Sequence, residues 1–224
     1  MSAVMIKTIE KLAKQGEGIL AADESTATIK KRFDAINVEN TEANRQAYRD
    51  MLFTTPNMNQ YINGVILFEE TLKQKGLDGQ PFSKKLESLG VIPGIKVDLG
   101  LIKLALTDNE LITRGIDTLR ERLTDYKEHG ALFAKWRAVY DITDVKPSKT
   151  AIASHAELLA RYAALCQEQD IIPIVEPEVI MDGDHTIERC EAVTREVLKA
   201  VFESLAIHNV KLEFIILKPN IIIS

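Results

Sequence analysis

The sequence is poor in the features that mark secreted and membrane proteins. It has only two cysteines, Cys166 and Cys190, without CxxC spacing, so we expect both to be reduced and structural. No apolar run approaches the roughly 20 residues that a membrane-spanning helix needs. The N-terminus, MSAVMIKTIEKLAKQ, is typical of an amphipathic helix rather than of a secretion signal. These absences predict a cytoplasmic protein that makes no membrane contact.

A large excess of charge of one sign is also missing. The net charge is -5 and both signs are interspersed along the chain, so no basic surface is expected to gather DNA or RNA. A few local lysines and arginines can still hold a small phosphate. Because the 224 residues contain no low-complexity linker and no charge block, we predict one domain over residues 1–224.

Short apolar runs rich in β-branched residues predict six buried strands. They span residues 18–23, 64–70, 94–100, 133–140, 171–179 and 213–223. Segments with helical spacing lie between them, at 41–53, 116–129, 154–169 and 187–208. This alternation of strand and helix predicts a parallel α/β fold.

Two parallel architectures fit this alternation, an open doubly wound sheet and a closed barrel. An open nucleotide-binding sheet usually has a glycine-rich phosphate loop after its first strand, whereas a barrel gathers its chemistry at the carboxyl ends of many strands. Here the first strand is followed by AADEST and no GxGxxG motif. The sequence therefore favours the barrel.

Charged residues occur at or near the far end of every predicted strand. They are Asp23 and Glu24, Glu69 and Glu70, Lys96 and Asp98, Lys135 and Arg137, Glu176 and Glu178, and Lys218. Residues two apart on a strand point to the same side, so several of these pairs can face one interior. Because both signs are present, a purely structural network of ion pairs is the alternative to a functional site.

Lys218 lies in the segment EFIILKPN, with apolar residues before it and a proline after it. A lysine amine attacks a carbonyl only in its neutral form, which an apolar site and a nearby cation such as Lys135 both favour. The alternative is a lysine whose ammonium group extends from the strand end into solvent.

Six motifs resemble the class I fructose-bisphosphate aldolases from one end of the chain to the other. They are GILAADEST, GVILFEET, GIKVD, FAKWR, PIVEPE and LKPN, in this order. The resemblance implies a (β/α)8 TIM barrel, with about six of its eight strands in this sequence. It implies a glycolytic lyase that reversibly cleaves fructose 1,6-bisphosphate to dihydroxyacetone phosphate and glyceraldehyde 3-phosphate. It also implies no cofactor and, for a full-length chain, a homo-oligomer, since the family forms tetramers.

The resemblance also assigns roles to residues of these motifs. It makes Lys218 the Schiff-base lysine and Glu176 the general acid and base. Lys135 and Asp23 would assist proton transfer and carbon–carbon cleavage, with Glu178 orienting the group. The positions that bind the phosphate at the aldehyde end would be Lys96, Arg137, Ser25 and Thr28. Those near the other end of the sugar would be Arg32 and Arg45.

The metal-dependent route to the same reaction needs a metal ion held by side chains such as histidines that converge in space. The four histidines are His129, His155, His185 and His208. All fall in predicted helices or loops, so we expect them at the surface or at helix ends and expect no metal site.

The printed sequence ends at LKPNIIIS, where the resemblance implies two further strands. From this we expect exposed strand edges and little or no activity from the 224-residue polypeptide alone. Two other hypotheses stay open. One is a catalytically impaired aldolase fragment that binds a partner chain, and the other is a Schiff-base aldolase that acts on a different phosphosugar.

Overall fold

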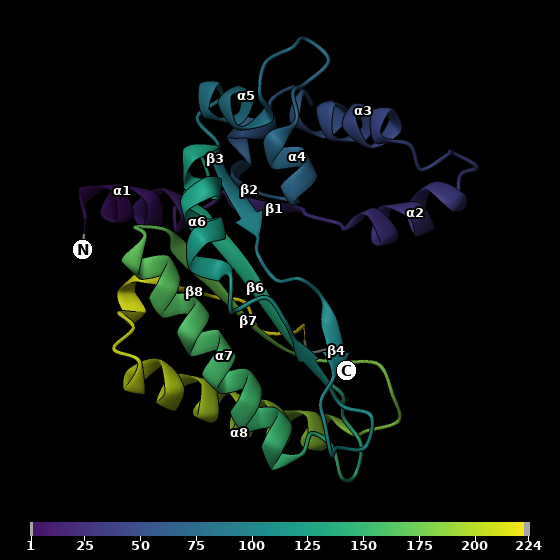
Figure 1. Cartoon of the computed structure of the whole chain (residues 1–224), viewed down its shortest axis with the longest axis vertical. Helices are drawn as coiled ribbons and strands as arrows, with labels where there is room; N and C mark the ends of the chain where they lie inside the picture. Colours follow the sequence, from purple (N-terminus) through teal and green to yellow (C-terminus); the bar gives the residue numbers. More distant parts are fainter. Residues whose placement is uncertain (1, 222–224) are drawn as a thin grey trace. The chain divides into compact units, whose positions relative to one another are not determined.

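The computed structural model describes residues 2–221, which its internal contacts divide into two compact units. The N-terminal unit comprises residues 2–96 and 123–134, and the C-terminal unit comprises residues 97–122 and 135–221. Figure 1 traces the elements of both along the chain. The prediction of a single domain stays a prediction.

The N-terminal unit is built on three parallel strands in the order β1-β2-β3. These strands are β1 (Gly18–Ala22), β2 (Ile62–Leu67) and β3 (Ile92–Lys96). The helices in its sequence are α1 (Ala3–Leu12), α2 (Thr26–Asp34), α3 (Glu42–Phe53), α4 (Glu69–Lys73) and α5 (Phe82–Ser88), with a 3-10 turn η1 at Met58–Gln60. The helix α6 (Leu119–Glu128) begins in the C-terminal unit and ends in this one.

Hydroxyl side chains begin three of these helices. Ser2, Ser25 and Thr41 each accept a hydrogen bond from the backbone N–H three residues further on, which satisfies one donor of the first turn. The cap at Ser25 fixes where the chain turns from β1 into α2. The acidic motif AADEST is therefore held at the carboxyl end of β1.

Two glycines make room for an aromatic ring in the core of the N-terminal unit. A Cβ on Gly94 of β3 would lie 2.4 Å from the ring of Phe133, and one on Gly64 of β2 would lie 3.2 Å from it. The distance at Gly94 is too short for any side chain, and the one at Gly64 is tighter than most Cβ contacts, so the two glycines let the ring lie closely against β2 and β3. Phe133 itself is fully buried.

The C-terminal unit is built on strands in the order β6-β7-β8. They are β6 (Phe133–Tyr140), whose first two residues belong to the N-terminal unit, β7 (Ile172–Val179) and β8 (Ile216–Leu217). The helices α7 (Lys149–Glu168) and α8 (Ile187–Ile207) pack on each other and on β7. A hairpin of β4 (Leu101–Lys103) and β5 (Leu111–Thr113) and a 3-10 turn η2 (Leu212–Phe214) complete the unit.

Trp136 shows which side of β6 is covered by helix. Its indole stacks on Tyr162 of α7, with 5.7 Å between the ring centroids. Lys135 and Arg137 flank Trp136 on β6, so alternation along the strand turns both of them to the face opposite α7.

The predicted strands lie where expected, but three of their ends are wrong. The strand predicted at 64–70 stops at Leu67, and Glu69 and Glu70 begin α4, where carboxylates favour the positive end of the helix dipole. The strand predicted at 94–100 stops at Lys96, and the β4–β5 hairpin that follows was not predicted. Of the segment 213–223, only Ile216–Leu217 is strand, and positions 222 and 223 lie outside the described residues.

One histidine contradicts its prediction. His155 lies inside α7 with 0% exposure and contacts the carbonyl oxygen of Leu111, at 3.0 Å from Nε2. His129 is exposed and His208 caps the end of α8, as expected. Both cysteines are free, as predicted, and both are buried. None of the helices described has the length and apolar character needed to cross a membrane.

Candidate active site

Five of the predicted site residues meet in the C-terminal unit, on neighbouring strands. Lys135 and Arg137 come from β6, Glu176 and Glu178 from β7, and Lys218 directly follows β8. In each strand the residues lie two apart or at the strand end, so they share one face. The strand order β6-β7-β8 puts the two carboxylates between the cations.

The backbone register fixes Lys218 beside Glu176. Val175 of β7 pairs with Leu217 of β8, and the backbone N–H of Lys218 donates to the carbonyl of Val175 at 2.9 Å. The next residue along each strand is therefore Glu176 on one side and Lys218 on the other. Proline at position 219 has no N–H to extend the ladder.

Glu176 is a buried carboxylate between two ammonium groups. Its side chain is only 3% exposed, its Oε1 accepts a hydrogen bond from Nζ of Lys218, and its Oε2 lies 3.4 Å from Nζ of Lys135. The Lys135 side chain is 10% exposed and that of Lys218 is 48% exposed. A buried carboxylate needs such partners, because an isolated charge in the interior is costly. The arrangement also lets a proton pass between Lys218 and Glu176 without solvent.

Arg137 and Glu178 form a second ion pair on the same two strands. Nε of Arg137 donates to Oε2 of Glu178. Burial by itself would lower the pKa of Arg137, but the bond to Glu178 and the nearby carboxylates outweigh it and raise that pKa. In the part of the chain that the structure describes, this bond occupies Nε, so the terminal guanidinium N–H groups remain available to a ligand.

The remaining predicted site residues lie in the N-terminal unit. Asp23, which is buried, follows β1, and the half-buried Lys96 ends β3. Ser25 and Thr28 contact each other at the start of α2, with 3.1 Å between their hydroxyl oxygens. Both hydroxyls are at the amino end of this nine-residue helix, where backbone N–H groups and the helix dipole favour an anion.

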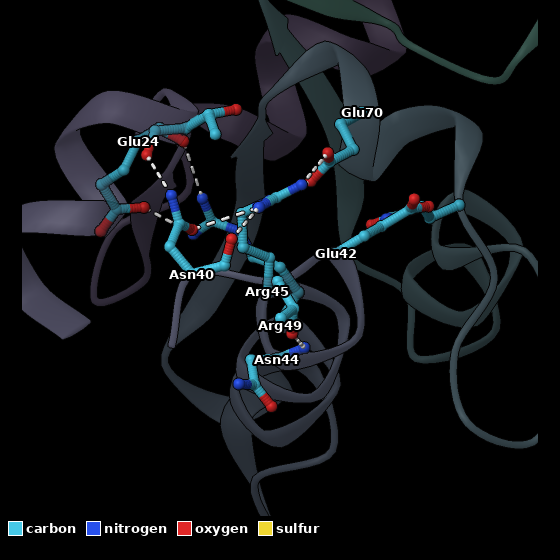
Figure 2. A network of polar contacts seen from close by, with 10 residues as sticks. Glu24, Asn40, Glu42, Asn44, Arg45, Arg49 and Glu70 are labelled. Atoms are coloured by element: carbon cyan, nitrogen blue, oxygen red, sulfur yellow. Dashed lines mark hydrogen bonds and ion pairs between the residues drawn. The ribbon is translucent and has the colours of Figure 1, made fainter. Parts of the chain in front are cut away.

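Arg32 belongs to a network centred on Glu24, of which Figure 2 labels Glu24 and Arg49. Nη1 of Arg49 donates to Oε2 of Glu24 at 2.5 Å, and its Nη2 donates to the Glu24 backbone oxygen at 3.1 Å. Nη1 of Arg32 lies 2.5 Å from Oε1 of the same carboxylate. The Arg49 side chain is 2% exposed and that of Arg32 is 58% exposed. Glu24 thus joins α2 and α3 to the end of β1.

Arg45, predicted to bind substrate, has its guanidinium engaged by protein groups. Its Nε and Nη2 each donate to Glu70 at 2.7 Å, and its Nη1 donates to the backbone and side-chain oxygens of Asn40 at 3.1 Å. The bond to Glu70 raises the pKa of Arg45 above its ordinary value. Figure 2 shows the two arginines, 45 and 49, on successive turns of α3. The role of Arg45 in substrate binding stays a prediction.

Sequence reasoning missed Arg49 and Asn40. Arg49 lies four residues after Arg45, hence on the same face of α3, and this spacing was the only signal for it. Asn40 precedes the α3 cap, and its amide also donates to the Thr26 backbone oxygen at 3.2 Å. Within residues 2–221, no group of three or more His, Cys, Asp or Glu side chains is arranged to hold a metal ion.

Comparison with known proteins gives one consistent result. The family model described as fructose-bisphosphate aldolase class-I matches residues 4–224. The chain is 56% identical over 218 residues to fructose-bisphosphate aldolase 7, cytosolic, of Arabidopsis thaliana. It is 54% identical over 220 residues to a probable fructose-bisphosphate aldolase class 1 of Xanthomonas campestris. It covers 61% of the plant protein and 66% of the bacterial one, while 97% and 98% of this chain are aligned.

A solved structure is also similar, that of the fructose-bisphosphate aldolase of Plasmodium falciparum in complex with TRAP and a small-molecule inhibitor. The TM-score is 0.95 at 51% identity, over 97% of this chain and 63% of that one. With β1, β2, β3, β6, β7 and β8 among the described residues, this likeness confirms the prediction of six strands of a (β/α)8 barrel.

Proposed function

Because the chain belongs to the class-I fructose-bisphosphate aldolase family, we propose that it takes part in the reversible cleavage of fructose 1,6-bisphosphate to dihydroxyacetone phosphate and glyceraldehyde 3-phosphate. One observation carries the proposal. A strand-end lysine, Lys218, is hydrogen-bonded to a buried carboxylate, Glu176, whose other oxygen faces a second lysine, Lys135. A Schiff-base lyase needs this combination of nucleophilic amine and adjacent proton acceptor.

Imine formation begins with a proton transfer across the bond between Lys218 and Glu176. The carboxylate takes a proton from the ammonium group, and the neutral amine adds to the ketone at C2 of the sugar. The protonated Glu176 then returns its proton to the C2 hydroxyl, which leaves as water, and the positively charged iminium remains on Lys218.

Cleavage uses the iminium as an electron sink. Glu176 or Asp23 accepts the proton of the C4 hydroxyl, the bond between C3 and C4 breaks, and its electron pair moves into the iminium to form an enamine. Glyceraldehyde 3-phosphate departs, a proton returns to C3, and hydrolysis frees dihydroxyacetone phosphate and Lys218. Glu178 orients Arg137 in this scheme, which the ion pair between them supports.

The two phosphates of the sugar need separate cationic or N–H groups. We assign the aldehyde-end phosphate to Lys96, Arg137, Ser25 and Thr28, and the other end to Arg32 and Arg45. The free guanidinium N–H groups of Arg137 and the helix amino end at Ser25 support the first assignment. For the second, the half-exposed Arg32 is better suited to reach a ligand than Arg45, whose donors face Glu70 and Asn40.

The further attributes of the family are proposals of the same kind. The partner is a phosphorylated sugar, the protein acts in the cytoplasm without a cofactor, and full-length chains assemble into a homo-oligomer. Two of the similar plant proteins carry cytosolic names, which supports the compartment.

Borohydride trapping tests the proposal on the purified chain. Dihydroxyacetone phosphate is added with sodium borohydride, which reduces an imine to a stable amine, and the labelled peptide is identified by mass spectrometry. We expect the adduct on Lys218, because the reduction captures the covalent intermediate. The variant Lys218→Arg should lose it, since a guanidinium cannot form the imine.

Lys211→Arg is the matched control, because Lys211 is an exposed lysine seven residues earlier on the chain. It should keep the adduct. An adduct that survives in Lys218→Arg, or a wild-type chain that is folded by circular dichroism and gives none, overturns the proposal.

A further inference from the structure

A pocket in the N-terminal unit lies away from every residue assigned above. Its volume is about 290 Å³, and it is lined by α1, α5, the start of β3 and the turn before β6. This volume is close to the lower end of the range of small-molecule sites, which is roughly 300–1,000 Å³. The pocket therefore suits a small ligand.

The floor of the pocket is apolar. Val91 and Ile92 at the start of β3 are buried, and Leu132 lies beside them, held by a hydrogen bond from its backbone N–H to the Pro93 carbonyl at 3.0 Å. These side chains come from neighbouring strand starts, so backbone pairing holds the floor in shape. A ligand that covers it gains from burying apolar surface.

Lysines form the rim. Lys7 and Lys11 lie four residues apart on one face of α1, and Lys84 comes from α5. Nζ of Lys11 extends over Gly90, where an added Cβ would lie 3.7 Å from it. Lys84 is paired with Glu87 at 2.8 Å. Among residues 2–221, no carboxylate forms an ion pair with Lys7 or Lys11, so the rim carries two uncompensated positive charges.

The pocket and the proposed substrate site lie at opposite ends of β3. Ile92, at the start of this strand, lines the pocket, and Lys96, at its end, is assigned to a phosphate of the sugar. At about 3.3 Å per residue, the two positions are roughly 13 Å apart along the strand. Each can be occupied without displacing the ligand of the other.

We infer that this pocket binds a small apolar anion, a compact aromatic or branched aliphatic body that carries one carboxylate. The apolar floor accommodates the body, and the carboxylate lies between the ammonium groups of Lys7 and Lys11. Neutral apolar molecules gain only the first interaction, and hydrophilic anions such as inorganic phosphate gain only the second.

Three probes separate these contributions. The binding of 2-naphthoate, of neutral 2-naphthalenemethanol and of inorganic phosphate to the purified chain is measured by titration, following the methyl NMR signals of Thr8, Val91 and Leu132. We expect saturable shifts at these methyls with 2-naphthoate and much weaker binding of the other two. The double variant Lys7→Gln/Lys11→Gln should weaken 2-naphthoate about three- to fivefold per lysine.

Lys14→Gln/Lys30→Gln is the matched control, since it removes two exposed lysines that do not line the pocket. It should bind 2-naphthoate as the wild type does. The inference is overturned if the acid and the alcohol bind equally, if no saturable shift occurs at the pocket methyls, or if both double variants lose the same affinity.

Discussion

Glu24 in the N-terminal unit and Glu176 in the C-terminal unit are carboxylates with similar surroundings, each facing one buried and one partly exposed cation. Around Glu24 the cations are arginines, Arg49 with 2% and Arg32 with 58% of the side chain exposed. Around Glu176 they are lysines, Lys135 with 10% and Lys218 with 48% exposed. The carboxylates themselves are 9% and 3% exposed.

The difference lies in what each cation can do with its proton. An arginine keeps its charge at any ordinary pH and binds in a fixed fork, so the Glu24 cluster can hold α2 and α3 in place but cannot supply a nucleophile. A lysine can lose a proton and become a nucleophile. We therefore predict that the Glu24 cluster is a structural clamp, whereas the Glu176 cluster supports imine formation.

Glu176→Gln removes the carboxylate that is bonded to Lys218. Of the predicted changes, it should have the largest effect. Glutamine keeps the shape of the side chain but cannot accept a proton from Lys218. Because general acid–base groups contribute about 10²–10⁴-fold, we expect imine formation with dihydroxyacetone phosphate to slow by at least about 10²-fold. The rate of borohydride-trapped adduct at Lys218 measures it.

Glu178→Gln is the control for that change, since it alters the neighbouring carboxylate of β7, which pairs with Arg137 and not with Lys218. Its trapping rate should fall much less. If Glu176→Gln traps at the wild-type rate, Glu176 is not the proton acceptor.

Arg49→Met tests the clamp. It removes the buried partner of Glu24 together with the bond to the Glu24 backbone oxygen. Breaking a buried ion pair leaves a charge poorly compensated, and we expect the free energy of unfolding to fall by about 3 kcal/mol. Urea denaturation monitored by circular dichroism measures this value.

Arg32→Met removes the exposed partner of the same carboxylate. The free energy of unfolding should fall by less than about 1 kcal/mol, because solvent screens a half-exposed ion pair. Equal losses for the two variants would show that burial does not set the strength of the clamp.

The sequence predicts the strands and the C-terminal cluster well for a physical reason. Buried parallel strands need continuous β-branched runs, and the period of two along a strand fixes that Lys135 with Arg137 and Glu176 with Glu178 share a face. The sequence also places Glu176 and Lys218 at or near their strand ends, and the register between β7 and β8 brings the two side chains together.

Features that depend on tertiary contacts could not be predicted in this way. Glu69 and Glu70 extend an apolar run like strand residues, yet the chain turns into α4 after Leu67. The guanidinium of Arg45 is hydrogen-bonded to Glu70, 25 residues away in the sequence, and to Asn40, five residues away. No local sequence pattern reveals these bonds. His155 was expected at the surface or at a helix end because it falls in a predicted helix away from the strand ends, but its face of α7 is the one that packs inward.

His155 extends the comparison to bases that are buried without a charged partner. In the N-terminal unit, burial alone would lower the pKa of Lys85, but Asp50 and Asp78 outweigh it and raise that pKa. In the C-terminal unit, burial lowers the pKa of His155 below its ordinary value of 6.5, and the Leu111 carbonyl and Glu110 offset this only in part. The edge of the Tyr140 ring, with centroids 4.9 Å apart, covers the imidazole.

This shift should make the stability of the folded chain decline in mild acid. The unfolded chain takes up a proton on His155 as the pH falls through about 6.5, whereas the folded chain does so only at lower pH, so this contribution is complete above 6.5 and is lost below it. One such group changes the free energy of unfolding by at most about 1.4 kcal/mol per pH unit. We expect His155→Gln to flatten the slope of stability against pH between pH 6.5 and 5 in urea denaturation. Equal slopes in wild type and His155→Gln would mean that the imidazole is protonated in the folded core.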